Sequence, residues 1–421
     1  MIRDPSSHPL DGIRRENGGA PALTALVADG SPELSIVLPF LKQARTVGRC
    51  VERARRFLLA ANLRGEVLVA DNGSADRSVE IATTAGARVV HAPARGYGAA
   101  LKAGIRAARA PWIAIGDSDD TYDFGELGPF VERLRAGCDL VIGNRFAGRI
   151  GDGAMPRLHR YLGNPALTLL ARLFFGTRCG DVYCGIRAFR KEAVEAMALQ
   201  SDGMEYAIEM VVKSAFMRLR VDEVPVTLSR GEDDRTPHLQ TWRDGRRSLR
   251  LYLLCAPQWV FLYPGVALVA AGLAGGALVE AGAGRVGAVR FDVHTLLYCG
   301  FAILIGSQAI FFSLFSRLLA MHAGLLPRSA AWERWIERSR VKTVLFVAGF
   351  LFVAGLGGSS WAVETWRRAE FGDLDPFRMF RIVIPSAVLL ALGCQVAFAS
   401  LYMSLLRHYR ERARDEPERA P

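Results

Sequence analysis

The sequence predicts a mainly parallel, doubly wound α/β domain, followed by an α-helical region that crosses a membrane four times. Two observations support this prediction. Short β-rich runs alternate with helical stretches from Leu34 onward, whereas after about Trp259 apolar residues collect in long stretches with few charges. In addition, a chain of 421 residues exceeds the roughly 250 to 300 residues at which a single core stops growing.

The front domain is predicted from five runs of buried-strand length, separated by intervals that suit crossover helices. These runs are Leu34–Phe40, Glu66–Ala70, Arg88–Ala92, Trp112–Gly116 and Asp139–Gly143. Ligands of such sheets lie beyond the carboxyl ends of the strands. The residues directly after each run are therefore the first candidates for a functional site.

The back half contains four apolar stretches, at about 259–281, 293–320, 342–361 and 381–406. Each is long enough to cross a hydrocarbon core of about 30 Å as a helix. Arginines are concentrated before the first span, between the second and third, and after the fourth. The positive-inside rule places these segments in the cytoplasm, on the same side as the front domain.

The net charge of +11 is compatible with nucleic acid, an anionic membrane surface or a phosphorylated substrate. Position favours the membrane, because the densest basic stretch directly precedes the first apolar span, where anionic lipid head groups would attract it. That stretch contains Arg243, Arg246, Arg247 and Arg250. We therefore expect membrane lipids as partners, and no nucleic acid.

Seven scattered cysteines form neither a disulfide framework nor a zinc pattern, which favours a reduced, cytosolic front domain. The first 30 residues lack the apolar core of a secretory signal. Only five of the 53 basic residues are lysine, a bias typical of a GC-rich bacterial gene. The prediction is an integral protein of a bacterial inner membrane, and a homo-oligomer is compatible with the sequence.

The expected organisation has five parts. They are a disordered arm (1–30), the α/β domain (31–236), an amphipathic interfacial helix (237–257), four transmembrane helices (258–408) and a basic cytoplasmic tail (409–421). The interfacial helix is expected because Trp242, Leu249 and Leu253 share one face of a helical wheel, while arginines share another. An ordinary linker helix with a solvated basic face is the alternative.

The most distinctive strand end is Asp117-Ser118-Asp119, which follows the fourth run. Two carboxylates at this spacing suit Mg²⁺ or Mn²⁺ held jointly by the protein and a diphosphate. By itself the tripeptide is short and common, and an acidic loop is the alternative reading.

Two further segments suggest a nucleotide. Asp71-Asn72-Gly73-Ser74 follows the second run, where the Asp71 carboxylate could accept hydrogen bonds from a nucleobase, although the segment also reads as a strand-to-helix turn. Gly96-Tyr97-Gly98 opens a helix and is only a weak match to a dinucleotide fingerprint. Its glycines would let the helix N-terminus approach a phosphate or a neighbouring strand.

Taken in order, these segments resemble family 2 glycosyltransferases of GT-A fold, which is Rossmann-like, and specifically the polyprenyl-phosphate hexosyltransferases such as dolichol-phosphate mannose or glucose synthases. The resemblance spans about Leu34 to Arg250. Its six segments are Ser35-Ile36-Val37-Leu38-Pro39, Val69-Ala70-Asp71-Asn72-Gly73-Ser74, Arg95-Gly96-Tyr97-Gly98, Asp117-Ser118-Asp119-Asp120-Thr121-Tyr122, Gly143-Asn144-Arg145-Phe146 and Asp181-Val182-Tyr183-Cys184-Gly185-Ile186-Arg187-Ala188-Phe189.

The resemblance implies a role for each segment. Asp117 and Asp119 would serve the metal, with Thr121 as a further ligand, and Asp119, Arg145 and Arg187 would be catalytic, the arginines holding phosphates of donor or acceptor. The residues assigned to donor binding are Pro39, Phe40, Gln43, Asp71, Gly73, Ser74, Gly96, Gly98, Asp117 and Ser118. Glu205 and Glu209 share a helical face and are weaker candidates for the acceptor pocket.

One departure concerns the Asn-Glu pair that the family usually has shortly after its opening proline. This chain has Lys42-Gln43 instead. The carboxylate that would help to recognise the ribose or base of the donor is therefore missing, although Gln43 can still accept a hydrogen bond.

The expected function is the inverting transfer of one hexose from a UDP- or GDP-linked sugar to a polyprenyl phosphate. A processive polysaccharide synthase is one alternative, but Gln240-Thr241-Trp242-Arg243 only partly matches the Gln-x-x-Arg-Trp motif of such enzymes. A non-catalytic membrane scaffold is the other alternative, suggested by Lys42-Gln43.

Overall fold

The computed structural model describes residues 31–231, 241–281, 285–286, 289–327, 334 and 341–415. The arm 1–30, most of the basic loop 328–340 and the last residues of the tail lie outside these ranges. The chain forms two compact units that divide between Cys255 and Ala256, with Ala323–Pro327 belonging to the first.

The first unit is built on a seven-stranded sheet of order β3-β2-β1-β4-β6-β5-β7. Its strands are β1 (Leu34–Phe40), β2 (Gly65–Asp71), β3 (Arg88–His91), β4 (Trp112–Ile115), β5 (Leu140–Ile150), β6 (Arg187–Arg190) and β7 (Val221–Leu228). The first four are parallel to one another, and β5 is parallel to β7. The five predicted strands and the mainly parallel sheet are therefore confirmed.

Strand β6 was not predicted, and it runs antiparallel to both β4 and β5. Its direction has a consequence for function. Arg187, its first residue, lies opposite Ile115, the last residue of β4. The segment that leads into β6 thus arrives at the edge where the parallel strands end.

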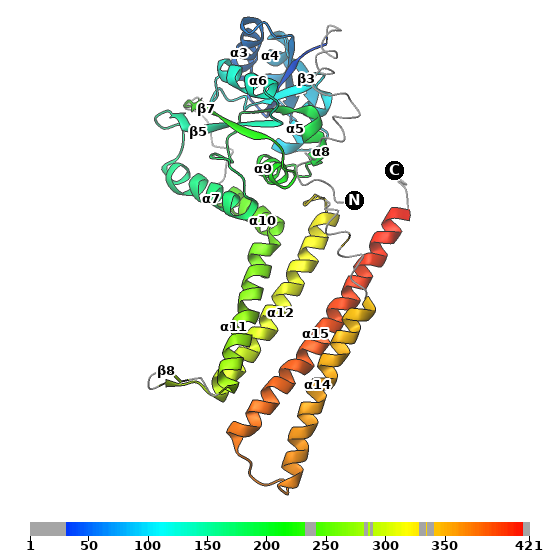
Figure 1. Cartoon of the computed structure of the whole chain (residues 1–421). Helices are drawn as coiled ribbons and strands as arrows, with labels where there is room; N and C mark the ends of the chain where they lie inside the picture. The colour runs from blue at the N-terminus through cyan, green and yellow to red at the C-terminus, as the bar shows by residue number, and fades with distance from the viewer. Residues whose placement is uncertain are drawn as a thin grey trace. The chain divides into compact units, whose positions relative to one another are not determined.

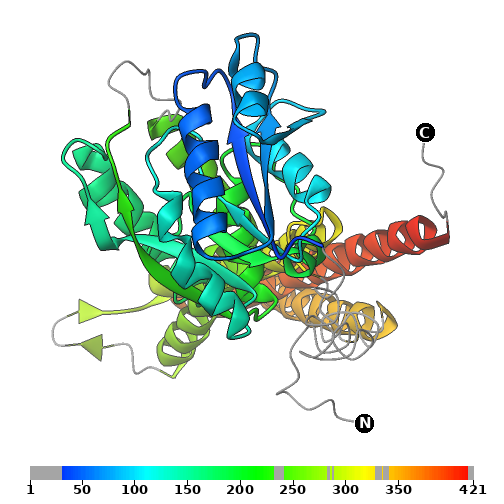
Figure 2. The same cartoon turned by 90° about the horizontal axis from the view of Figure 1, so that it is seen from above.

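Helices cover both sides of this sheet, as the blue α3 and the cyan α5 show on either side of the blue strands in Figure 2. They form because apolar residues recur at helical spacing, as in α3, which buries Val47, Cys50, Val51, Ala54 and Phe57. The helices of this unit are α3 (Val47–Ala60), α4 (Ser78–Thr84), α5 (Tyr97–Ala107), η1 (Phe124–Leu127), α6 (Gly128–Arg135), η2 (His159–Gly163), α7 (Asn164–Phe175), α8 (Lys191–Met197), α9 (Tyr206–Phe216) and α10 (Thr241–Cys255).

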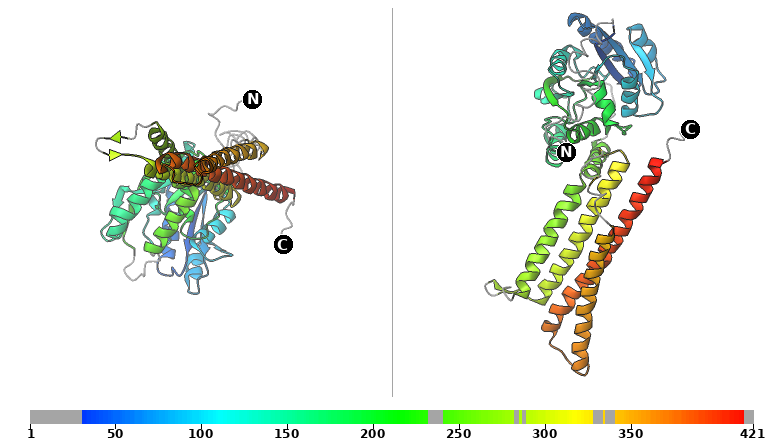
Figure 3. Two further views of the ribbon diagram at one scale, coloured as in Figure 1. Left: turned by 90° about the horizontal axis from the view of Figure 1, so that it is seen from below. Right: turned by 45° about the vertical axis from the view of Figure 1, so that its right-hand side comes forward.

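The second unit consists of long apolar helices, which Figures 1 and 3 show as extended rods. They are η3 (Gln258–Leu262) with α11 (Tyr263–Glu280), α12 (Val293–His322), α14 (Val341–Arg368) and α15 (Pro376–Asp415), with a short hairpin of β8 (Arg285–Val286) and β9 (Val289–Arg290). In the described part of the chain, four helices are long and apolar enough to span a membrane. The predicted number of spans is confirmed.

Glycines bring the membrane helices close together. A Cβ atom at Gly265 of α11 would come within 2.8 Å of the Gly306 carbonyl of α12. Similarly, one at Gly393 of α15 would come within 2.9 Å of the Ala348 carbonyl of α14. Lipid tails are as apolar as the helices, so the hydrophobic effect does not drive the helices together. Their association depends on close packing, which small residues such as glycine allow.

Candidate active site

The predicted metal motif lies directly after β4. The hydroxyl of Tyr97 donates to the Asp117 carboxylate at 3.0 Å. Burial, reinforced by the negative charge of Asp119, raises the pKa of Asp117 to about 7. Two carboxylates that repel each other at a strand end form a site that a divalent cation would stabilise.

Asp119 is oriented by its own loop. Its carboxylate accepts hydrogen bonds from the Thr121 amide at 3.2 Å and the Thr121 hydroxyl at 2.5 Å. In this conformation Thr121 therefore orients Asp119, whereas the resemblance implied that Thr121 is itself a ligand of the metal. Across the described residues, no group of three or more His, Cys, Asp or Glu side chains is arranged to hold a metal. The carboxylates of Asp117 and Asp119 are oxygen donors of the kind that Mg²⁺ and Mn²⁺ take, and phosphate oxygens or water would have to supply the remaining ligands.

The metal loop is anchored to β1 and to the start of α3. The Ser118 hydroxyl donates to the Pro39 carbonyl at 2.9 Å. The Thr46 hydroxyl lies 2.7 Å from the Ser118 carbonyl and 3.0 Å from the Gln43 side-chain oxygen, so its single hydrogen is shared between two acceptors. Gln43 is buried. The metal loop is thus fixed to its neighbours by contacts of Pro39, Gln43 and Ser118. The sequence suggested donor binding for these residues, and not this supporting role.

The segment after β2 is likewise held by its neighbours. The Ser74 hydroxyl accepts the Lys42 amide at 3.0 Å, and its own amide donates to Asp71. Phe40 is buried, and Gly73 has a φ of 90°, which favours glycine. Ser74 therefore orders the turn.

The Asp71 side chain faces His91, a residue that the sequence analysis did not select. The Nδ1 atom of His91 lies 3.0 Å from an Asp71 carboxylate oxygen. The two residues are in register at the ends of β2 and β3. A histidine directly at a strand end was the signal that could have identified it.

The glycines that open α5 make room for protein backbone. A Cβ atom at Gly96 would nearly overlap the Asp202 carbonyl, and one at Gly98 would come within 2.5 Å of the Ser201 carbonyl. Of the two expectations for these glycines, the structure supports close approach of a neighbouring segment. Tyr97, between them, contacts the metal motif.

Arg145 lies at the same edge, within β5 and not after it as predicted. Strand β5 continues because Asn144 and Arg149 pair with β7 across a bulge. The Arg145 guanidinium makes two hydrogen bonds to the fully buried Asp181, through Nε at 2.6 Å and Nη2 at 2.8 Å. Among the described residues Nη1 has no hydrogen-bond partner, so one edge of the guanidinium remains available for a phosphate.

Arg187 has different partners from the phosphate groups that the resemblance implies. It is fully buried, and its guanidinium donates to the carbonyls of Cys184 and Val182 at 3.0 and 2.8 Å and of Ala207 at 2.5 Å. A buried guanidinium that donates to three backbone carbonyls orders the backbone around it. In this conformation Arg187 shapes the segment before β6 and presents no surface to a substrate.

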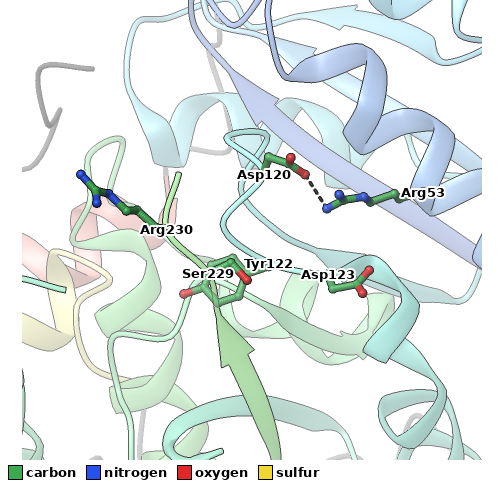
Figure 4. A pocket seen from close by; sticks show the side chains of 6 residues that line it. All are labelled: Arg53, Asp120, Tyr122, Asp123, Ser229 and Arg230. Carbon is green, nitrogen blue, oxygen red and sulfur yellow. Dashed lines mark hydrogen bonds and ion pairs between the residues drawn. The ribbon is translucent and has the colours of Figure 1, made fainter. Parts of the chain in front are cut away.

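Asp120, next to the metal motif, is paired with two arginines of α3. Arg53 lies 2.6 Å and Arg49 lies 3.6 Å from its carboxylate. Asp120, Arg53 and Arg230 line a cavity of about 440 Å³ together with Tyr122, Asp123 and Ser229, as Figure 4 shows. The cavity lies beside the metal loop, and both arginine and aspartate side chains line it.

The two candidate glutamates differ. Glu209 is buried, lies 2.7 Å from the Lys213 ammonium, and accepts the amides of Gln200 and Ser201. Burial opposes ionisation of Glu209, but these contacts keep its pKa below the ordinary value. Glu209 is thus a structural residue. Glu205 lies 3.6 Å from Arg247 of α10.

Two protein-family models match the chain. The model of glycosyl transferase family 2 matches residues 35–197, and that of the glycosyltransferase family 2 C-terminal transmembrane region matches residues 314–407.

Among similar proteins, the low-salt glycan biosynthesis hexosyltransferase Agl6 of Haloferax volcanii is 33% identical over 393 residues, 93% of either chain. A dolichyl-phosphate hexose transferase of that organism is 31% identical, over 46% of this chain and 82% of its own. An undecaprenyl-phosphate mannosyltransferase of Micrococcus luteus is 30% identical, over 38% of this chain and 71% of its own. The chain therefore belongs to glycosyltransferase family 2 and is a membrane glycosyltransferase with a GT-A-type sheet.

Proposed function

We propose that this enzyme transfers a single hexose from a UDP- or GDP-linked sugar to a polyprenyl phosphate, with inversion at the anomeric carbon and with Mg²⁺ or Mn²⁺ bound. The observation that carries the proposal is the meeting of Asp117, Asp119 and Arg145 at one sheet edge. Two relatives are named for transfer to dolichyl or undecaprenyl phosphate. Four helices fit for membrane spans would keep such a lipid within reach.

In this proposal, Asp117 and Asp119 hold the metal, which neutralises charge on the leaving diphosphate when it is bound. Tyr97 donates a hydrogen bond that orients Asp117, and Thr121 does the same for Asp119. Arg145, fixed by Asp181, offers its free edge to a phosphate of the donor or the acceptor. Positioning and charge neutralisation are the main contributions of these residues.

The acceptor needs no general base. The second pKa of a phosphate monoester is about 6, so its attacking oxygen is largely anionic at neutral pH. A sugar hydroxyl, in contrast, would have to lose a proton as it attacks, normally to a nearby carboxylate or histidine. The carboxylates of Asp120 and Glu205 are both paired with arginines, which suits ion pairing better than proton transfer.

Amide replacement of these carboxylates is therefore expected to preserve most of the turnover. Glu205→Gln and Asp120→Asn should each retain transfer within about tenfold, well short of the 10²- to 10⁴-fold loss typical of a removed base. Asparagine suits the positive φ of Asp120. Glycolipid formation at saturating donor measures the effect. A loss of about 10²-fold or more, with normal metal and donor binding, would favour a hydroxyl acceptor.

We also propose that α10 lies on the membrane surface. Leu249, Leu253 and Leu254 are exposed, while Leu251 and Tyr252 are buried in the first unit. Exposed leucines beside arginines are typical of an interfacial helix. The α/β domain (31–236) and the transmembrane region (258–408) are likewise proposed with the boundaries given above.

The catalytic domain and the chain's end are predicted to face the cytoplasm of a plasma membrane. Four spans return the tail to the side of the front domain, and the arginine-rich loops share that side. Reporter domains fused after Pro421 and within the 281–292 loop should give opposite locations, cytoplasmic and external. External activity of the Pro421 fusion would contradict this orientation.

A substrate panel tests the proposed function directly. The purified full chain is offered UDP- and GDP-sugars with undecaprenyl and dolichyl phosphates, and any glycolipid is identified by mass. One added hexose is expected. Products longer than one sugar would support a processive synthase, and no turnover with any pair would support a non-catalytic scaffold.

A further inference from the structure

The pair of Asp71 and His91 lies at the carboxyl edge of the sheet, but only one of the two is accessible. Asp71 is 4% exposed, and its two carboxylate oxygens contact the Ser74 amide at 2.9 Å and the His91 ring at 3.0 Å. The side chain of His91 is 70% exposed. A ligand that arrives at this edge would meet the imidazole before the carboxylate.

The pairing determines which imidazole nitrogen is available. Burial favours the protonated form of Asp71, but the Ser74 and His91 contacts outweigh it and hold the pKa below its ordinary value. An ionised carboxylate only accepts hydrogen bonds, so Nδ1 of His91 must carry the hydrogen that points at Asp71. In a neutral ring, Nε2 is then an acceptor. Within the described parts of the chain, Nε2 has no hydrogen-bond partner.

The distance from this pair to the metal motif suits a nucleotide. Strands β3, β2, β1 and β4 are consecutive neighbours, so three spacings of about 4.8 Å separate β3 from β4 by about 14 Å across the sheet. Along the strands, Ile115 is level with Arg88, and the chain continues from Ile115 through Asp117 toward the edge where His91 lies. A nucleoside diphosphate with its phosphates at Asp117 and Asp119 could extend along the edge toward His91. The base would then lie at the end of the sheet.

We propose that His91, oriented by Asp71, is the residue that reads the nucleobase of the donor, and that it accepts the ring N–H of uracil or guanine. These two bases carry a hydrogen on the central nitrogen of the pairing edge, whereas cytosine and adenine carry a lone pair there. A neutral Nε2 therefore accepts a hydrogen bond from uracil or guanine. Against cytosine or adenine, its lone pair would face another lone pair. This inference rests on the proposed function, since it assumes a nucleotide-sugar donor.

The test compares the affinities of five probes for the full chain in lipid nanodiscs with Mg²⁺: UDP, GDP, CDP, ADP and inorganic pyrophosphate. UDP or GDP should bind at least about tenfold more tightly than CDP and ADP, a factor expected for one hydrogen bond and its unpaired alternative. His91→Phe keeps a ring but removes the acceptor, and should reduce the affinity for the preferred nucleotide to the affinity for CDP. Pyrophosphate affinity should stay unchanged.

Two controls separate the outcomes. His91→Gln restores a side-chain oxygen acceptor and should recover part of the preference, whereas His294→Phe makes the same substitution on α12 and should change nothing. If the nucleotide preference survives in His91→Phe, the assignment of His91 is overturned while the proposed donor class stands. A wild-type preference for CDP or ADP would also overturn it. If no nucleotide binds better than pyrophosphate, the nucleotide-sugar donor itself is refuted, and this inference with it.

Discussion

Replacing Asp119 by asparagine is expected to abolish sugar transfer while leaving the fold intact. The carboxylate lies in a loop after β4, and its partners, the Thr121 amide and hydroxyl, can also bond to an amide oxygen. The substitution removes the negative charge that a divalent cation requires, so the metal-bridged diphosphate would lose one of its two protein ligands. We expect a loss of about 10²- to 10³-fold or more in glycolipid formation, since removal of one group that stabilises transition-state charge typically costs this much.

The matched control is Glu132→Gln, which makes the same change on the exposed surface of α6. Both variants should unfold at the parent's temperature, and only Asp119→Asn should lose transfer and metal-dependent donor binding. Activity of Asp119→Asn within a few-fold of the parent, in metal-limited buffer, would contradict its assignment to the metal.

The front half of the site could be predicted because parallel strands place their last residues at one edge. Apolar runs of strand length identify β1 to β4, and the polar residues that follow them must then lie together. Asp71 and Asp117 were found in this way. The spans were equally predictable, because length and apolar composition alone determine whether a helix fits a bilayer.

Side-chain partners could not be predicted from one sequence. Arg187 looked like a phosphate ligand, but β6 runs antiparallel, and its guanidinium is surrounded by carbonyls of the segments beside it. Gln43, at the position of the family's usual carboxylate, is buried against Thr46. In both cases the outcome depends on contacts between residues far apart in sequence, for which local periodicity gives no signal.

Neutralising Arg145 is the second change expected to have a large effect, and the pair with Asp181 complicates its interpretation. Removal of one partner from a buried ion pair typically costs about 3–5 kcal/mol of stability, because the other charge remains buried. Arg145→Gln alone would therefore lower both stability and transfer. The loss of transfer could then reflect unfolding, a misplaced backbone or the missing phosphate contact.

A double-mutant cycle separates these causes. Asp181→Asn removes the pairing carboxylate but keeps the cation, and Arg145→Gln with Asp181→Asn removes both charges while leaving groups that can hydrogen-bond. The double variant should recover much of the unfolding temperature that Arg145→Gln loses. Its transfer should nevertheless remain at least about 10²-fold below the parent, because no cation would face the phosphate. Asp181→Asn should retain more transfer than either variant that lacks the arginine. If the double variant regains turnover along with stability, then Arg145 serves only to pair with Asp181. Other groups must then hold the phosphate, and Arg53 and Arg230 beside the metal loop would be the next to test.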